Sequence, residues 1–268
     1  MPPCAWVPSP LLDNAPWTQR DAEAARRCLR GRRVWVLGNS VARHWAFVLV
    51  DLLLHNATKP RSYSPMLRAD EKHRCGAGGA LGGKVPSSKP NCFGLCGCDF
   101  WELDGLLGRD KSLTFLWEWS LAANATAAAL GGPLSPDVVV YNAGVTARMM
   151  ALEGKSSENE EARARLRAMI EATLAERPSM RFYWRSTTAT CRGWVQFNEE
   201  QARLNRAIER SICGVERLRS LDAFNWTLNR CPSYDDRIHH SRLAFQHVTT
   251  WLRAECTEVG AATGEGVG

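Results

Sequence analysis

The chain has 268 residues, of which 45% are hydrophobic and 23% are charged, and its formal net charge is +6. This length and composition predict a folded protein with one large domain or two small ones. The arginines are spread along the sequence rather than gathered in a basic block, so the charge does not indicate a nucleic-acid-binding surface. The longest apolar stretch, WAFVLVDLLL, contains Asp51 and is shorter than the ~20 residues that cross a bilayer, so no membrane span is expected.

Five short runs of apolar, β-branched and aromatic residues predict β-strands. They are RVWVL, LTFLW, DVVVY, RFYW and VERLRSL, at residues 33–37, 113–117, 137–141, 181–184 and 215–221. Helical patterns fall between most of them, and this alternation predicts an α/β fold with a mainly parallel sheet. We expect one domain over residues 1–256, followed by a flexible tail over 257–268.

Three helices are predicted from apolar residues spaced three and four apart. The first covers 157–176, where Ser157 and Glu160 form a capping box, and the second begins at Asn198, with Gln201 at the capping-box position. The expected inward-facing residues are Leu166, Met169, Ile170 and Leu174 in the first helix, Leu204 and Ile208 in the second, and Phe245, Val248 and Leu252 in a third that follows Ser241.

The ten cysteines and the three Asn-x-Thr sequons, at Asn56, Asn124 and Asn225, favour a secretory, Golgi or extracellular environment. The first residues of the chain lack the basic and apolar regions of a signal peptide. Glycines and cysteines are concentrated in residues 75–98, which predicts a long irregular insertion.

One group of cysteines in this insertion raises the question of a zinc site. The segment CFGLCGCDF brings together Cys92, Cys96 and Cys98, with His73 and Cys75 upstream. Their spacing differs from paired Cys-x-x-Cys knuckles, so disulfides are favoured, and neither a metal nor another cofactor is expected. A zinc protein remains an alternative, and it predicts stoichiometric metal in the purified protein.

The segment VWVLGNSVARHW, at residues 34–45, predicts a strand that ends at Gly38 and a helix that continues to about Leu54. Ser40 would then lie at the carboxyl end of a strand and the N-terminus of a helix, where open α/β sheets bind ligands. The backbone amides of the first helical turn are able to hold a developing oxyanion. The simpler interpretation is that Asn39 or Ser40 only caps the helix.

Two further motifs carry groups suited to acyl transfer. Asp236 and His239 are three residues apart, so the carboxylate is able to orient the imidazole and stabilise its charged form. The strand at 137–141 ends at Asn142, whose amide is able to donate to a tetrahedral intermediate, and Gly144 follows. Each motif alone has an ordinary interpretation, respectively a surface ion pair and a turn asparagine.

In this order, the serine, asparagine and Asp-x-x-His blocks resemble those of the SGNH (GDSL-type) esterase and acyltransferase superfamily. CLRGRRVWVLGNSVARHW is similar to the opening of its trichome-birefringence-like and PC-esterase branch, which includes the sialate O-acetyltransferase domain. In that branch an arginine follows the serine by three residues, here Arg43. LTFLWEWS, PDVVVYNAG, RFYWRSTTATC and LRSLDAFNW are similar to later segments, so the resemblance runs from about Cys4 to Leu252.

The resemblance implies a three-layer α/β/α sandwich and a set of roles. Ser40 would be the acylated nucleophile, His239 the general base and then acid, and Asp236 the residue that orients His239. The oxyanion would be held by the Ser40 amide and Asn142. Supporting positions would be Gly38, Asn39, Arg43 and Gly144.

This sequence departs from the pattern of that branch at several positions. Asn39 replaces the usual aspartate of Gly-Asp-Ser, Val145 and Thr146 replace a His-Trp pair, and Arg237 stands where relatives often have glycine. His240 is a second histidine next to the expected base.

The resemblance implies transfer of an acyl group, most simply acetyl, to or from a carbohydrate hydroxyl, with transfer preferred to hydrolysis. The partners would be an acyl donor and a glycan, and the eleven tryptophans are suited to stacking on sugar rings. The alternative is a non-catalytic glycan-binding or scaffold protein on the same fold.

Overall fold

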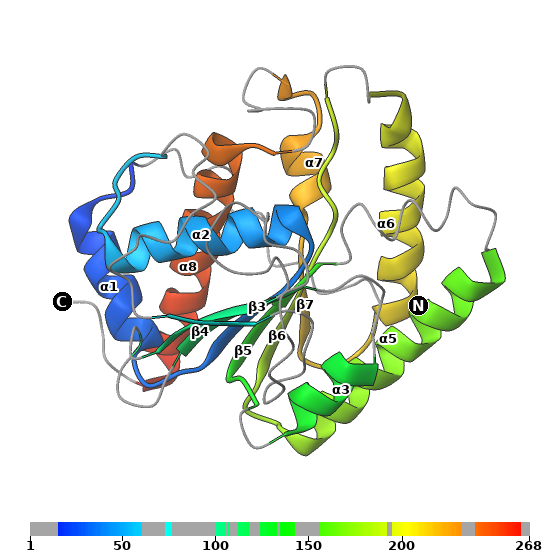
Figure 1. Ribbon diagram of the computed structural model, residues 1–268, viewed down its shortest axis with the longest axis horizontal. Helices are drawn as coiled ribbons and strands as arrows, with labels where there is room; N and C mark the ends of the chain where they lie inside the picture. Colours follow the sequence, from blue (N-terminus) through cyan, green and yellow to red (C-terminus); the bar gives the residue numbers. More distant parts are fainter. Residues whose placement is uncertain are drawn as a thin grey trace.

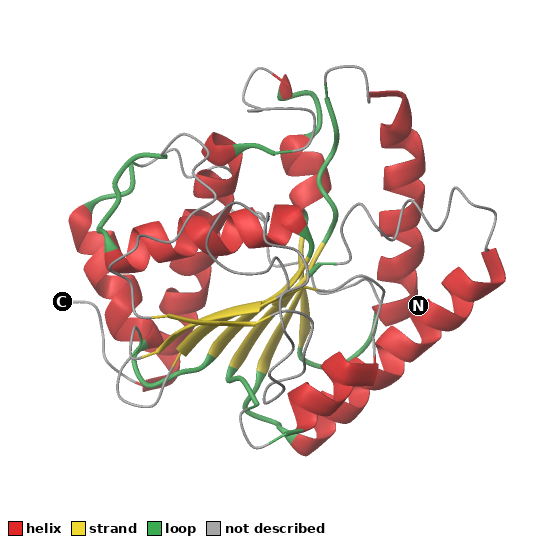
Figure 2. Ribbon diagram, viewed as in Figure 1, coloured by secondary structure: helices red, strands yellow, loops and turns green. Residues whose placement is uncertain are grey.

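The centre of the molecule is a seven-stranded sheet in the order β2-β3-β4-β1-β5-β6-β7 (Figures 1 and 2). The computed structural model describes residues 16–60, 73–76, 100–104, 107, 112–117, 124–132, 135–142, 156–191, 195–231 and 239–263. The strands are β1 Val34–Gly38, β2 His73–Gly76, β3 Phe100–Asp104, β4 Ser112–Trp117, β5 Val138–Tyr141, β6 Arg181–Arg185 and β7 Leu218–Leu221.

Five of these strands, β4, β1, β5, β6 and β7, run parallel, and they are the five predicted from sequence. The antiparallel pair β2 and β3 extends the sheet beyond β4 and was not predicted. The start of the predicted insertion is therefore a strand, since β2 contains Cys75 and Gly76. The rest of the insertion lies outside the described residues.

Helices cover both faces of the sheet (Figure 1). On one face lie α1 Gln19–Leu29, α2 Ser40–Leu54 and α8 Ser241–Thr263, and on the other α3 Asn124–Gly131, α5 Ser156–Glu176 and α6 Asn198–Ile212. The short helix η1 Val195–Phe197 precedes α6, and the short helix α7 Ala223–Thr227 follows β7. Because α8 continues to Thr263, residues 257–263 of the expected tail are helical.

Alternate residues of each strand enter separate cores, as the pleat of a sheet requires. Val34 and Val36 pack with α1, α2 and α8, whereas Trp35 and Leu37 pack with α3, α5 and α6. Two hydrophobic layers thus enclose the sheet, which confirms the predicted three-layer α/β/α architecture.

The expected inward faces of the three predicted helices are all buried. The predicted capping box of α6 is wrong, however, because the N-cap residue is Phe197 and no side chain bonds to the helix end there. Asn198 instead bonds to Thr190, and Gln201 is buried beside Asn205. The side chain of Ser157, in the other predicted box, lies outside the described part of the chain.

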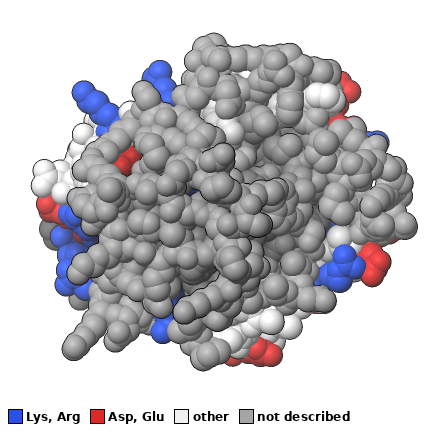
Figure 3. Space-filling view, in the orientation of Figure 1, with Lys and Arg blue, Asp and Glu red and all other residues white. Residues whose placement is uncertain are grey.

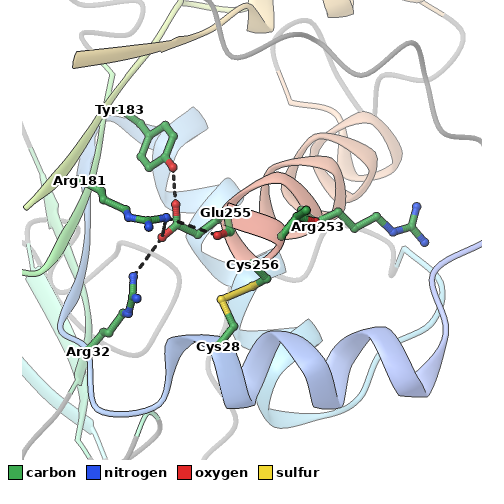
Figure 4. Close-up of a disulfide and its surroundings, with 8 residues drawn as sticks. Cys28, Arg32, Arg181, Tyr183, Arg253, Glu255 and Cys256 are labelled. Carbon is green, nitrogen blue, oxygen red and sulfur yellow. Dashed lines mark hydrogen bonds and ion pairs between the residues drawn. A yellow bond between two sulfur atoms is a disulfide. The ribbon is translucent and has the colours of Figure 1, made fainter. Parts of the chain in front are cut away.

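Two disulfides are present in the described part of the chain, and they indicate an oxidising environment. Cys28 joins α1 to Cys256 of α8 (Figure 4), and Cys191 joins Cys231. Cys213 is disulfide-bonded as well. Within the described residues, no helix has the length and hydropathy needed to cross a membrane.

A buried acidic residue, Glu255 of α8, links three elements at the end of the sheet where the strands begin (Figure 4). Its side chain is fully buried and forms ion pairs with Arg32 at 3.2 Å and Arg181 at 3.0 Å. The Tyr183 hydroxyl donates a hydrogen bond to the same carboxylate. Burial, followed by the charge of Glu255, raises the pKa of Tyr183, so the phenol stays protonated as the donor.

On the face shown in Figure 3, the visible Lys, Arg, Asp and Glu side chains of the described residues lie along the rim, with blue and red groups near one another.

Candidate active site

The junction between β1 and α2 places Ser40 at the first position of the helix. Asn39 is the N-cap, and its side-chain oxygen accepts a hydrogen bond from the Val41 amide at 3.2 Å. Of the two candidate caps in the sequence, Asn39 therefore performs this task. Ser40 is half-buried, and the cap uses neither its hydroxyl nor its backbone amide.

Gly38 is required at this turn for two reasons. Its φ of +147° is one that L side chains rarely adopt. A Cβ atom there would also lie 2.6 Å from the Asn142 carbonyl oxygen and 2.7 Å from the Ala42 Cβ. The turn between β1 and α2 is thus in close contact with the end of the neighbouring strand β5.

Three site residues lie side by side because three parallel strands end at the same edge of the sheet. Leu37 of β1 is paired with Tyr141 of β5, and Tyr141 with Trp184 of β6. The next residues along these strands are Gly38, Asn142 and Arg185. The chain crosses from β4 on one side of β1 to β5 on the other, so this edge is a topological switch point, where α/β folds bind ligands.

Asn142 is almost completely buried, with 1% of its surface exposed. Its Nδ2 donates to the Arg185 carbonyl at 2.8 Å and lies 3.5 Å from the Thr187 hydroxyl. Because a carbonyl only accepts, these contacts fix which end of the amide faces β6. Oδ1 has no hydrogen-bond donor among the described residues. One N–H is therefore engaged by the Arg185 carbonyl. Among the described residues the second makes only the long 3.5 Å contact with the Thr187 hydroxyl, which leaves it a candidate donor.

The structure brings His239 close to the start of α2. His44 follows Ser40 by one helical turn and so lies on the same side of the helix. The rings of His44 and His239 meet edge to face, with centroids 6.1 Å apart. His239, which precedes α8, is therefore near the helical turn that begins with Ser40.

The neighbouring His240 occupies a different environment. It is 2% exposed, and its carbonyl accepts the first hydrogen bond of α8, from the Ala244 amide at 2.8 Å. Burial, the charge of Arg185 and the nearby His44 hold the pKa of His240 well below its ordinary value, so this imidazole is neutral. His239 is only half-buried, which makes it the more accessible of the two histidines.

Several basic side chains are buried near this edge of the sheet. Arg43 is 7% exposed and Arg185 is 1% exposed. Burial and the charge of Arg185 also lower the pKa of His247, whose Nδ1 accepts a hydrogen bond from Trp45 Nε1 at 3.1 Å. Among the described residues, Arg43 and Arg185 thus place two guanidinium groups near the strand ends.

Some of the expected site residues are not placed by the structure. Asp236, Arg237 and Gly144 lie outside the described residues, as do Val145 and Thr146. The three closely spaced cysteines of the zinc alternative do as well, and within the described part of the chain no group of three or more metal-binding side chains occurs.

Arg185, Thr187 and His44 were not identified from sequence. Arg185 had one local signal, since it is a charged residue directly after four strand residues in RFYWR and before a serine- and threonine-rich run. The contacts of Asn142 with Arg185 and Thr187 join residues more than forty positions apart, and nothing in either segment indicates them.

No protein-family model matches the chain, and no curated protein matches it. Among solved structures, a peptidoglycan O-acetylesterase is 10% identical, with 93% of this chain and 97% of that one covered and a TM-score of 0.46. The acetylxylan esterase Axe2 from Geobacillus stearothermophilus is 12% identical over 86% of this chain and 95% of its own, with a TM-score of 0.37. The lipase Lip_vut3 from a goat rumen metagenome is 16% identical over 55% of this chain and 80% of its own, with a TM-score of 0.40. Likenesses this distant carry no argument about activity, which must come from the residues of the site.

Proposed function

We propose that this protein transfers an acyl group, most simply acetyl, through a covalent ester on Ser40. The observation that supports this most directly is the division of tasks at the start of α2. Asn39 caps the helix, while Ser40 begins it at the carboxyl end of β1, and the ring of His239 meets that of His44, one helical turn after Ser40. A serine whose only task was capping would not need this neighbour.

The chemistry follows from these positions. His239 accepts the proton of the Ser40 hydroxyl as its oxygen attacks the acyl carbonyl, and Asp236 orients the imidazole and stabilises its charged form. The negative carbonyl oxygen of the tetrahedral intermediate accepts hydrogen bonds from the Ser40 amide and the second N–H of Asn142. His239 then donates its proton to the leaving group as the bond to the carbonyl carbon breaks, which leaves acyl-Ser40.

The second half of the reaction repeats these steps with a new nucleophile. His239 removes a proton from a hydroxyl of the acceptor, the acceptor oxygen attacks acyl-Ser40, and the serine hydroxyl is restored by the proton from His239. Transfer and hydrolysis differ only in whether a sugar hydroxyl or water attacks. We prefer O-acetyl transfer to a glycan, because the sequence resembles the branch that contains the sialate O-acetyltransferase domain. The disulfides suit a secretory compartment such as the Golgi lumen.

The test is intact-protein mass spectrometry after brief incubation with p-nitrophenyl acetate. The wild type should gain one acetyl group, mapped by peptide analysis to Ser40. Ser40→Ala should gain none at this position, and His239→Ala should acylate more slowly by ~10²-fold or more, because the hydroxyl then lacks its base.

His55→Ala is a matched control, because His55 lies at the opposite end of α2, and this variant should acylate like the wild type. A wild type that is folded, as judged by circular dichroism, but forms no adduct at Ser40 would contradict the proposal. It would favour a non-catalytic glycan-binding protein, for which glycan-array binding that persists in Ser40→Ala is the expected sign.

A further inference from the structure

The last residue of β6 and the segment after it, Arg185–Cys191, are buried next to Asn142 of the candidate site, and we call these residues the β6 shelf. Every one of its residues is at most 1% exposed, although it contains one serine and three threonines. Buried backbone groups need hydrogen-bond partners, and an irregular segment cannot find them in a sheet. The side chains that supply these partners therefore determine where the shelf lies.

Two asparagines of α6 hold the shelf in the same manner. Asn205 accepts from the Thr187 amide at 3.0 Å and donates to the Thr187 carbonyl at 2.9 Å. Asn198 accepts from the Thr190 amide at 2.7 Å and donates to the Thr190 carbonyl at 3.0 Å. Only an amide side chain offers a donor and an acceptor in this arrangement.

The two attachment points differ in what they contact. Asn142 binds the first part of the shelf, through the Arg185 carbonyl and, at longer distance, the Thr187 hydroxyl. No contact joins Asn142 to Thr190 among the described residues. The position of the Asn142 amide therefore depends on the main chain at residues 185–187. Pairing with Leu221 of β7 holds its first two residues, and Asn205, unlike Asn198, holds the third, Thr187.

We propose that Asn205 is a positioning residue for the oxyanion-binding amide of Asn142. The proposal rests on the proposed function of Ser40 and Asn142. Without the Asn205 amide, the buried N–H and C=O of Thr187 lose their partners, and the main chain shifts to satisfy them. The carbonyl of Arg185 moves with it, and the second N–H of Asn142 no longer points to the oxyanion. Such a change weakens binding of the transition state more than binding of the substrate.

The experiment compares Asn205→Ala with Asn198→Ala, which removes the same two kinds of hydrogen bond from the same helix and shelf. Steady-state kinetics with p-nitrophenyl acetate give kcat and KM, and thermal unfolding gives the Tm of each variant. For Asn205→Ala we expect kcat to fall about 10-fold with KM within twofold, since small misplacements of catalytic groups have effects of this size or larger. Asn198→Ala should keep kcat within twofold despite a similar loss of Tm.

Two further variants keep the result interpretable. Asn142→Leu removes the oxyanion donor itself, and its loss of kcat, ~10²–10³-fold, is the largest effect that misplacing this donor can have. In the double variant, Asn205→Ala should therefore cause little further loss of kcat. If Asn205→Ala does not fold, Asn205→Asp preserves the volume and the acceptor for the Thr187 amide, and it should still lose kcat selectively.

Equal losses of kcat in the Asn205 and Asn198 variants, or an unchanged kcat in the Asn205 variants, would overturn the positioning role while leaving acyl-Ser40 intact. A wild type without acylation at Ser40 would instead overturn the proposed function, and this inference with it.

Discussion

At the scale of single residues, the start of α2 separates two tasks that the sequence alone does not assign. Asn39 is 3% exposed and satisfies the Val41 amide, while Ser40 is left as a candidate nucleophile. Asn39, which replaces the aspartate of the Gly-Asp-Ser pattern that the sequence resembles, therefore has a structural task as the cap. An asparagine and an aspartate both accept the capping hydrogen bond.

This interpretation predicts opposite outcomes for two substitutions. Asn39→Ala should lower the free energy of unfolding by about 1 kcal/mol, because the cap is lost. Asn39→Asp should match the wild type or exceed it, because a carboxylate accepts the same bond and is favoured at a helix N-terminus. Urea denaturation measures both, and equal destabilisation of the two variants would contradict the capping role.

Glu209 of α6 provides a pH-dependent prediction. Burial, followed by the negative charge of Asp222, raises its pKa from 4.5 to about 7. Between these values the folded state binds more protons than the unfolded state, so the free energy of unfolding falls as pH rises. The full effect of such a shift is about 3 kcal/mol.

The lowered pKa values of His240 and His247 make the free energy of unfolding rise with pH, which is opposite to the effect of Glu209. They act equally in the wild type and in Glu209→Gln, so the difference between the two proteins isolates Glu209. Urea denaturation at several pH values should show Glu209→Gln gaining stability relative to wild type from about pH 4.5 to pH 7. A difference that does not change with pH would be evidence against the raised pKa.

At the scale of elements, the sequence predicted what depends on local pattern. The five parallel strands and the apolar faces of the predicted helices were correct because burial leaves a periodic signal. The position of Ser40 between β1 and α2 was predictable for the same reason. The roles of Asn198 and Gln201 were not, since their capping-box spacing gave no sign that Thr190 and Asn205 would be their partners.

The edge pair β2 and β3 shows a second limit of the sequence. β2 is only four residues long and begins a region rich in glycine, so turn chemistry dominates its local signal. Its pairing with β3 joins residues such as Cys75 and Trp101, which are far apart in the chain. Long-range contacts of this kind also determine how Asn142 is held, and neither could be predicted without the fold.

The junction of β1 and α2 makes its own prediction through Gly38. Gly38→Ala should destabilise the protein by more than about 2 kcal/mol, because the approach of Asn142 opposes a Cβ in addition to the φ of the residue. It should also displace Ser40 and reduce acylation. Gly31→Ala is the control, since Gly31 also has a positive φ, of +77°, but no atom lies within 4 Å of its Cβ position.

The measurement is urea denaturation of both variants, together with the rate of Ser40 acylation. Gly31→Ala should lose about 1–2 kcal/mol with normal acylation, which is the cost of the backbone conformation alone. If Gly38→Ala lost no more stability than Gly31→Ala and acylated normally, close packing at the nucleophile turn would be disproved.

At the scale of the whole molecule, the buried carboxylate of Glu255 connects α8 to the start of β6 and to the segment before β1 (Figure 4). Glu255→Gln should destabilise the protein by about 3–5 kcal/mol, because two arginines then lose the charge that compensates them. Glu171→Gln is a matched control, since its 2.8 Å ion pair with Arg167 is exposed on α5 and should contribute less than about 1 kcal/mol.

Chemical denaturation of the two variants tests this contrast, and acylation of Ser40 should be unchanged in both, because Glu255 lies at the opposite end of the sheet from the candidate site. Similar small losses in the two variants would show that the Glu255 cluster is no more important than a surface ion pair.

The disulfide between Cys28 and Cys256 has a mechanical consequence. It closes a ring across 228 positions, and Ser40, Asn142 and His239 all lie inside that ring. Tension applied between Gln19 of α1 and Thr263 of α8 passes from one helix to the other through the sulfur atoms and does not load the sheet. In an optical trap with handles at these two residues, the oxidised protein should extend only by the residues between each handle and the ring. Reduction should release roughly 750–820 Å of additional contour length, at 3.3–3.6 Å per residue over those 228 positions.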